Sequence, residues 1–166
     1  MTVTAVQKQP ESLRFTVVAE FTASPERVWQ LWEDPRQLER WWGPPGWPAT
    51  FTTHELRPGG RAEYHMTGPG GEQPRAFWQV VEVDPPRHLV LQDKFANPDG
   101  SPDESLPPTR MQVTIAPLGD GRTQMQVESR FSTREAMERL IALGMVEGLT
   151  QAIGQIDEIL QEVAVR

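Results

Sequence analysis

The chain has 166 residues, no cysteine and a formal net charge of −7. This length predicts one domain with a sizeable core, and the lack of cysteine excludes disulfides and thiolate chemistry. The scattered arginines form no basic stripe of the kind that nucleic-acid binding needs, and no apolar run reaches the ~18 residues of a membrane span. We therefore expect a cytoplasmic protein that binds no nucleic acid and does not insert into a membrane.

The beginning of the chain predicts a loose lead, a strand and two short helices. Residues 1–12 are polar and lack the apolar core of a signal peptide, so we expect a flexible lead before one domain over residues 13–166. The stretch LRFTVVAEF alternates between apolar and polar residues, which is typical of a half-buried strand. Ser24 and Asp34 each precede a proline, which is the pattern of an N-cap followed by the first helical residue.

The middle of the chain predicts six more strands, for about seven in all. Turn sequences such as TGPGGEQ, DPPR and GDGR separate them and favour antiparallel hairpins. In RAFWQVVEV both faces carry apolar residues, so a one-residue slip would turn Phe77 inward in place of Trp78. The predicted strands are ATFTTHEL, RAEYHM, RAFWQVVEV, HLVLQDKF, TRMQVTIAPL and TQMQVESRF.

The end of the chain predicts one long helix over about residues 133–163. Ser132 and Glu135 match a capping box, and apolar residues recur at helical spacing. Gly144 and Gly148 interrupt this apolar stripe, although a glycine inside a helix costs ~1 kcal/mol relative to alanine. They allow either close packing on the sheet or room for a ligand. A helix covering antiparallel strands indicates an α+β layered fold.

Four segments resemble the activator-of-Hsp90-ATPase-homologue-like branch of the START-related (SRPBCC) superfamily. They are FTASPERVWQLWEDPRQLERWWGP, HELRPGGRAEYHMTGPGG, VVEVDPPRHLVLQDKF and MVEGLTQAIGQIDEIL. The resemblance covers roughly residues 13–160 and implies the helix-grip fold of START and Bet v 1-like proteins. In that fold a curved antiparallel sheet wraps round a long C-terminal helix and leaves a cavity between them. The superfamily includes lipid carriers, hormone receptors and polyketide cyclases, so the fold does not fix the function.

Departures from the family pattern bear on partners and cofactors. Leu149 follows Gly148 where the family often has tryptophan, and the sequence shows neither the N-terminal domain nor the asparagine- and tryptophan-rich motif of the co-chaperone members. We therefore do not expect an Hsp90-type chaperone as a partner. The sequence contains no H-E-x-x-H motif, no histidine pair and no carboxylate cluster, so we expect no metal site and no cofactor.

The segment RWWGPPGWP, at residues 40–48, gathers three tryptophans where no regular helix or strand can form. The rings either plug the open end of the sheet as core or form a cavity wall, and a plug at a cavity mouth serves as both. Pro44 and Pro45 force the chain out of the preceding helix. We expect Trp42 to be buried at the cavity border and Trp47 to be more exposed and mobile.

The phase of the strands and the stripe of the helix together predict a cavity beneath the last helix. Asp93 is the one acid on an otherwise apolar phase of its strand. It either faces the cavity, as a group that orients a ligand or as a base with raised pKa, or it marks the solvent-exposed strand end. Ser129 is a similar candidate. The predicted ligand-binding residues are Trp42, Tyr64, Met66, Trp78, Leu91, Asp93, Met111, Val113, Ser129, Phe131, Met137, Ile141 and Met145.

Three functions are compatible with these features. The first is binding of a small apolar molecule, with no catalytic residue assigned. The second is a cyclase- or dehydratase-like enzyme that uses the same cavity, which two or more convergent polar groups would favour. The third is a protein-interaction module, with a homodimer as one possibility, which an exposed apolar patch over a filled core would favour. The sequence leaves the identity of the ligand open.

Overall fold

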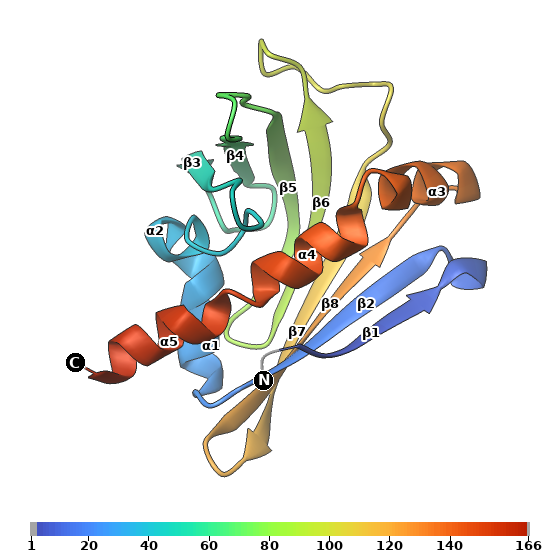
Figure 1. Ribbon diagram of the computed structural model, residues 1–166. Coiled ribbons are helices and arrows are strands. Elements are labelled where there is room, and N and C mark those ends of the chain that lie inside the picture. The colour runs from blue at the N-terminus through green and yellow to red at the C-terminus, as the bar shows by residue number, and fades with distance from the viewer. Residues whose placement is uncertain (1–2, 166) are drawn as a thin grey trace.

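The computed structural model describes residues 3–165 and has the predicted α+β architecture. One antiparallel sheet of eight strands, in the order β1-β2-β8-β7-β6-β5-β4-β3, curves beneath the C-terminal helices (Figure 1). The strands are β1 (Val3–Gln9), β2 (Arg14–Phe21), β3 (Ala49–His54), β4 (Arg61–Met66), β5 (Arg75–Asp84), β6 (His88–Ala96), β7 (Thr109–Gly119) and β8 (Arg122–Arg130). The helices are α1 (Pro25–Glu33), α2 (Pro35–Leu38), α3 (Arg134–Ala142), α4 (Met145–Ile153) and α5 (Ile156–Val165).

The eighth strand, β1, lies in the segment that the sequence predicts to be a flexible lead. It pairs antiparallel with β2, with Val6 opposite Val17 and Lys8 opposite Phe15. The short helix Pro10–Ser12 then turns the chain into β2. An edge strand of this kind is held by backbone hydrogen bonds, and most of its side chains are exposed, so it shows no clear apolar alternation. Residues 1–2 lie outside the described residues.

Both predicted helix starts are confirmed. The Ser24 hydroxyl accepts a hydrogen bond of 3.2 Å from the backbone N–H of Arg27, and the Asp34 carboxylate accepts one of 2.9 Å from the N–H of Arg36. Each bond satisfies a backbone donor that has no partner within its helix. The caps thus fix where α1 and α2 begin, and α1 turns Trp32 into the core.

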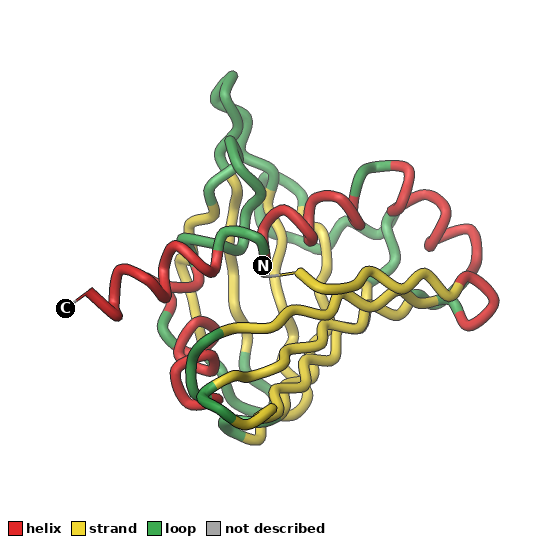
Figure 2. The backbone as a smooth tube through the Cα atoms, turned by 60° about the horizontal axis from the view of Figure 1, so that its bottom comes forward, coloured by secondary structure: helices red, strands yellow, loops and turns green. Residues whose placement is uncertain are grey.

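The single long C-terminal helix of the sequence prediction is instead three shorter helices laid end to end across the sheet (Figure 2). The first break follows Leu143, where Gly144 takes φ of +91°, a conformation that suits glycine. The second break lies at Gly154. The N-cap is Thr133 rather than Ser132, because the Thr133 hydroxyl accepts from the N–H of Ala136 at 3.0 Å. Each piece keeps its own apolar face, so the sequence stripe conceals the breaks.

We expect Gly144→Ala and Gly148→Ala to change stability in opposite directions. At Gly144 the positive φ disfavours alanine, and the expected loss in the free energy of unfolding is ~1–2 kcal/mol. Gly148 lies inside α4, and a Cβ there meets no atom within 4 Å, so alanine should add up to ~1 kcal/mol. Urea unfolding of both variants measures the difference. Equal effects at the two positions would contradict the break at Gly144.

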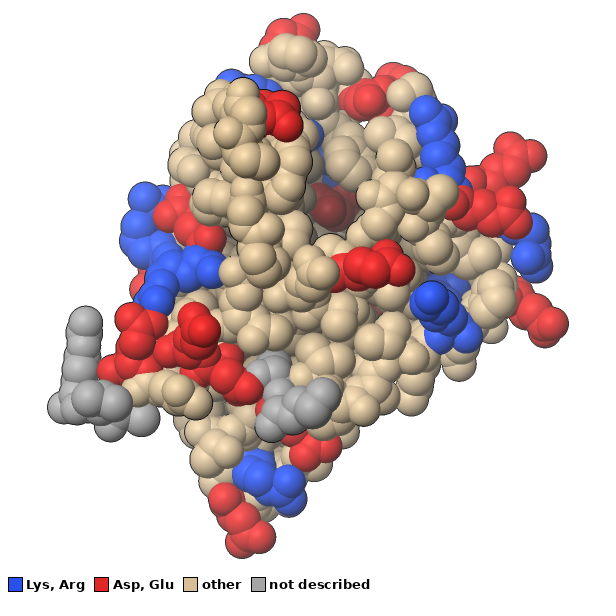
Figure 3. Space-filling view, viewed as in Figure 1, with Lys and Arg blue, Asp and Glu red and all other residues tan. Residues whose placement is uncertain are grey.

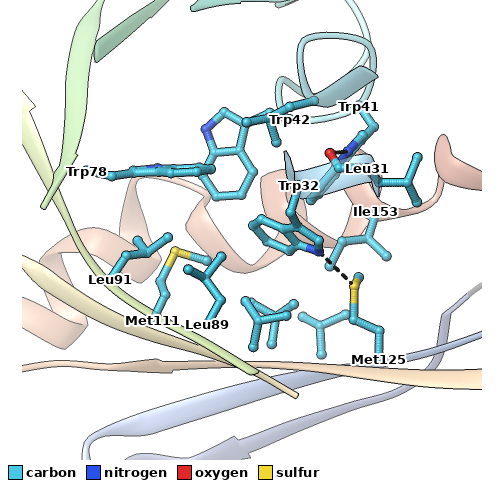
Figure 4. Close-up of a cluster of buried hydrophobic side chains, with 14 of the residues drawn as sticks. Leu31, Trp32, Trp41, Trp42, Trp78, Leu89, Leu91, Met111, Met125 and Ile153 are labelled. Atoms are coloured by element: carbon cyan, nitrogen blue, oxygen red, sulfur yellow. Dashed lines mark hydrogen bonds between the residues drawn. The ribbon is translucent and has the colours of Figure 1, made fainter. Parts of the chain in front are cut away.

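The core between the sheet and α1 is built around a cluster of tryptophans (Figure 4). The rings of Trp32 and Trp41 lie 4.8 Å apart and those of Trp42 and Trp78 5.0 Å apart. Trp32 donates its indole N–H to the sulfur of Met125 at 3.3 Å, and Trp41 donates to the carbonyl of Leu31 at 3.0 Å. These contacts tie α1 and the segment after α2 to the sheet.

The packing of this core shows which of Trp78 and Phe77 points inward and how deeply Trp42 and Trp47 are buried. Trp78 faces inward, while Phe77 lies on the other side of β5 with the Arg61 guanidinium 3.8 Å from its ring centre, so the predicted register holds. Trp42 is 6% exposed, and Trp47 is more exposed, as predicted. Trp47 also packs on Gly68, where a Cβ would come within 2.6 Å of the indole ring. The sequence shows no sign of this contact.

A candidate small-molecule pocket

A hollow of about 230 Å³ opens between β4, β6 and β7 of the sheet and the junction of α3 with α4. Its wall is mostly apolar. Figure 3 shows a hollow on the face seen in Figure 1, with acidic atoms recessed inside it. The structure brings six of the predicted site residues to this wall, namely Trp42, Tyr64, Met66, Asp93, Met111 and Met145.

The other seven predicted residues do not line the hollow. The alternation of residues along a strand shows which side chains point to the concave face of the sheet. It does not show which parts of that face are covered by side chains from other elements. Trp32 from α1 fills the region beside Trp78, with the ring centres 6.0 Å apart. Ile141 is half-buried and packs against the core. The six that are buried elsewhere are Trp78, Leu91, Val113, Ser129, Phe131 and Met137.

Most of the lining residues outside the predicted set lie where the C-terminal helix breaks. Leu143 is 67% exposed at the mouth of the hollow. Gly144 and Gly148 both line the hollow, and a Cβ added to either would meet no atom within 4 Å. The two glycines therefore leave open space rather than close contact, and their spacing was the available signal. The lining residues outside the predicted set are Pro44, Phe95, Thr109, Leu140, Leu143, Gly144, Gly148 and Leu149. For Gly144 and Gly148, room for a ligand was one of the two alternatives that the sequence left open.

Two polar side chains from separate strands meet at the hollow. The Tyr64 hydroxyl on β4 donates a hydrogen bond of 2.9 Å to the Oδ1 atom of Asp93 on β6. Between them lies β5, whose Trp78 is paired with Asp93 in the ladder. Asp93 is among the residues that line the hollow.

Burial controls the titration of this pair. Loss of water around the carboxylate raises the pKa of Asp93 from 3.8 to about 7, although the hydrogen bond from Tyr64 acts in the opposite direction. Burial, followed by the negative charge of Asp93, raises the pKa of Tyr64 well above 10.0. Tyr64 therefore stays protonated as a donor, and Asp93 exchanges a proton near neutral pH.

Two indole N–H groups lie beside this pair. Those of Trp42 and Trp78 are buried and make no hydrogen bond of good geometry with any described residue. Both are nevertheless close enough to the Tyr64 hydroxyl to lower its pKa, against the larger effect of burial. Trp42 itself lines the hollow, so its ring contributes to the wall.

The described residues place two limits on other kinds of site. Among residues 3–165, no group of three or more histidine, aspartate or glutamate side chains is arranged to hold a metal ion. Within the same part of the chain, no helix is long and apolar enough to cross a membrane. The polar side chains that line the hollow, among the described residues, are those of Tyr64, Asp93 and Thr109.

Solved structures with similar folds cover nearly the whole chain. A protein from Arthrobacter aurescens is 50% identical, with a TM-score of 0.93, and the match covers 97% of this chain and 93% of that one. Protein Ms6760 from Mycobacterium smegmatis is 41% identical, with a TM-score of 0.88 and coverages of 95% and 96%. DynU16, a putative protein of the dynemicin biosynthetic locus, is 17% identical with a TM-score of 0.63 over 90% of this chain and 47% of its own, which shows the fold alone.

Comparison with known protein families identifies the family of this chain. Among curated proteins, none matches the chain significantly. Residues 22–161 match the family described as Activator of Hsp90 ATPase homolog 1-like protein, and this range spans α1, α2, the six strands β3 to β8 and the C-terminal helices as far as residue 161. The chain belongs to the Activator of Hsp90 ATPase homolog 1-like family, as its Trp-Trp-Gly-Pro and Leu-Arg-Pro-Gly-Gly motifs indicate.

Proposed function

We propose that the protein binds a small, mostly apolar molecule in the hollow beneath α4. The observation that supports this most strongly is the combination of an apolar wall with a few convergent polar groups. Binding pockets for small molecules commonly have this composition, because apolar contact supplies affinity and the polar groups fix orientation. The exposed Leu143 and Phe95 at the rim extend the apolar surface outward.

The volume of the hollow limits the size of the ligand. Pockets for drug-sized molecules commonly measure ~300–1,000 Å³, whereas this hollow measures about 230 Å³. A two-ring aromatic compound or a short branched chain therefore suits it better than a long lipid. Three flexible methionines in the wall, Met66, Met111 and Met145, allow the shape to adjust to the ligand.

Filling the hollow should abolish binding without unfolding the protein. Gly148→Phe places a ring in the open space beside Gly148. We expect it to weaken the binding of a neutral naphthalene-based fluorescent probe by at least ~10-fold, because a pocket contact of one ring is worth more than ~1.4 kcal/mol. Fluorescence titration gives the dissociation constants.

Gln151→Phe is the matched control for this experiment, because residue 151 is exposed on the same helix. It adds the same ring outside the hollow and should leave the dissociation constant within ~3-fold of the original. Similar loss in both variants would indicate a disturbed helix instead of a filled pocket. Unchanged binding by a folded Gly148→Phe variant would reject the hollow as the binding site.

A second candidate function, proton transfer on a bound substrate, is favoured by one observation. Asp93 has a pKa of about 7 and lies in the hollow within hydrogen-bond distance of Tyr64, and a general acid or base works best with a pKa near the operating pH. In such a reaction Asp93 would accept a proton from the substrate and return it at another position. Turnover of a compound bound in the hollow would separate this enzyme from a carrier.

A further inference from the structure

We propose that the ligand presents a hydrogen-bond donor, an amine or a hydroxyl, to the carboxylate of Asp93. This inference rests on the proposed function, because it names the chemistry of the ligand that the same hollow accepts. The ligand is thus an apolar body with one donor group, and carboxylic acids are poor ligands.

The Asp93 carboxylate has one hydrogen-bond partner and no cation. Tyr64 donates to Oδ1 at 2.9 Å, and the described residues supply no second donor and no ion pair. The residues opposite Asp93 in the sheet are Trp78 on β5 and Thr109 on β7, and both are uncharged. Asp93 is also the single charged side chain among the described residues that line the hollow. Its second oxygen is therefore available to a ligand.

A carboxylate in an apolar wall is costly to keep charged unless a donor or a cation approaches it. Hydrogen bonds to a charged acceptor are stronger than bonds between neutral groups, so a ligand donor gains more here than at an exposed carboxylate. The raised pKa of Asp93 is consistent with this shortage of partners. An acceptor-only ligand would leave the second oxygen without a partner.

The surroundings favour a positive group over a negative one. Trp42, Tyr64 and Phe95 contribute aromatic rings to the wall, and an ammonium is attracted to the faces of such rings. The chain carries a net charge of −7, which draws cations toward the protein and repels anions. Amines and hydroxyls both carry the donor that the Asp93 carboxylate lacks.

The experiment compares four compounds that differ in one group on the same naphthalene ring. They are 2-naphthylmethylamine, 2-naphthalenemethanol, the methyl ether of that alcohol and 2-naphthoic acid. Titration calorimetry slightly above neutral pH, where Asp93 is mainly ionised, gives the four dissociation constants. We expect the amine and the alcohol to bind at least ~10-fold more tightly than the ether, as a hydrogen bond to a charged group predicts, and the acid to bind most weakly.

Two variants assign the preference to Asp93. Asp93→Asn keeps an acceptor for Tyr64 but removes the charge, and Asp93→Leu removes both. In each, the amine and the ether should bind within ~3-fold of each other. In the original protein the preference for the amine should also shrink as the pH falls below about 7, since Asp93 takes up a proton there.

The outcomes separate the donor inference from the proposed pocket. If the four compounds bind with equal affinity, or if the donor preference persists in Asp93→Leu, the donor inference is wrong while the pocket stands. If none of the four binds, the pocket itself is rejected. A larger preference for the amine than for the alcohol assigns the effect to charge, and an equal preference assigns it to the hydrogen bond; either result supports a donor at Asp93.

Discussion

Trp42→Ala is expected to lower the free energy of unfolding by ~3–5 kcal/mol and to abolish probe binding at the same time. Trp42 is 6% exposed and its ring lies 5.0 Å from Trp78, 5.6 Å from Trp41 and 6.1 Å from Tyr64, measured between ring centres. Its removal leaves a large void in a cluster that cannot close around it. Because the same ring lines the hollow, the pocket loses a wall.

Trp47→Ala is the matched control for this effect. Trp47 comes from the same segment but is only half-buried, and its ring packs on Gly68. We expect a loss of about 1 kcal/mol, because this ring covers the surface and fills no core, and we expect unchanged probe binding. Urea unfolding and fluorescence titration measure both variants. If folded Trp42→Ala bound the probe normally, the ring would be a core plug without a role in the pocket.

The elements that the sequence predicted well are those set by local chemistry. The side chains of Ser24 and Asp34 cap the backbone within three residues, so the starts of α1 and α2 could be read directly. The hairpin strands followed from alternation and turn residues. β1 was missed because most of its side chains are exposed, so no apolar alternation marks it. The break at Gly144 was missed because an apolar stripe continues across it.

The candidate site was predicted only in part, because periodicity gives the direction of a side chain and not the packing of other elements over it. Periodicity determines which face of a strand points inward, and it placed Tyr64, Asp93 and Met111 correctly on the concave face. It cannot determine how much of that face other elements cover. Trp32 from α1 fills the region beside Trp78, and Phe131 stacks on Phe15, 6.0 Å away between ring centres. The hollow therefore remains only toward the α3–α4 junction.

The meeting of Tyr64 with Asp93 depends on strand order, which periodicity does not contain. The two residues are separated by 29 positions and lie on strands that are next but one in the sheet. Their contact arises because β5 pairs with both β4 and β6. The sequence showed Asp93 as an acid on an apolar phase, but the donor that faces it could only be found from the fold.

Asp93→Asn is expected to stabilise the protein increasingly as the pH rises from about 4 to above 7. The pKa of Asp93 is about 7 in the folded protein and near 3.8 when the chain is unfolded. Below 3.8 both states are protonated and the carboxyl carries no penalty. Between the two values the unfolded state ionises first, so the original protein loses stability as the pH rises. The loss is complete above the folded pKa and amounts to at most about 4 kcal/mol.

The measurement is urea unfolding of the original protein and Asp93→Asn at several pH values across this window. Asparagine keeps an oxygen that can accept from Tyr64, so the comparison isolates the charge, and the other carboxyl groups contribute equally to both proteins. The gain should be close to zero near pH 4 and largest near pH 8. Asp103→Asn is the control, because the hydrogen bond from Ser105 lowers the pKa of this exposed carboxyl from 3.8, so its ionisation changes below the measured window and the effect of the substitution should stay nearly constant across it. A gain from Asp93→Asn that did not change with pH would show that Asp93 is ionised normally in the folded protein, and it would remove the electrostatic basis for a donor-bearing ligand.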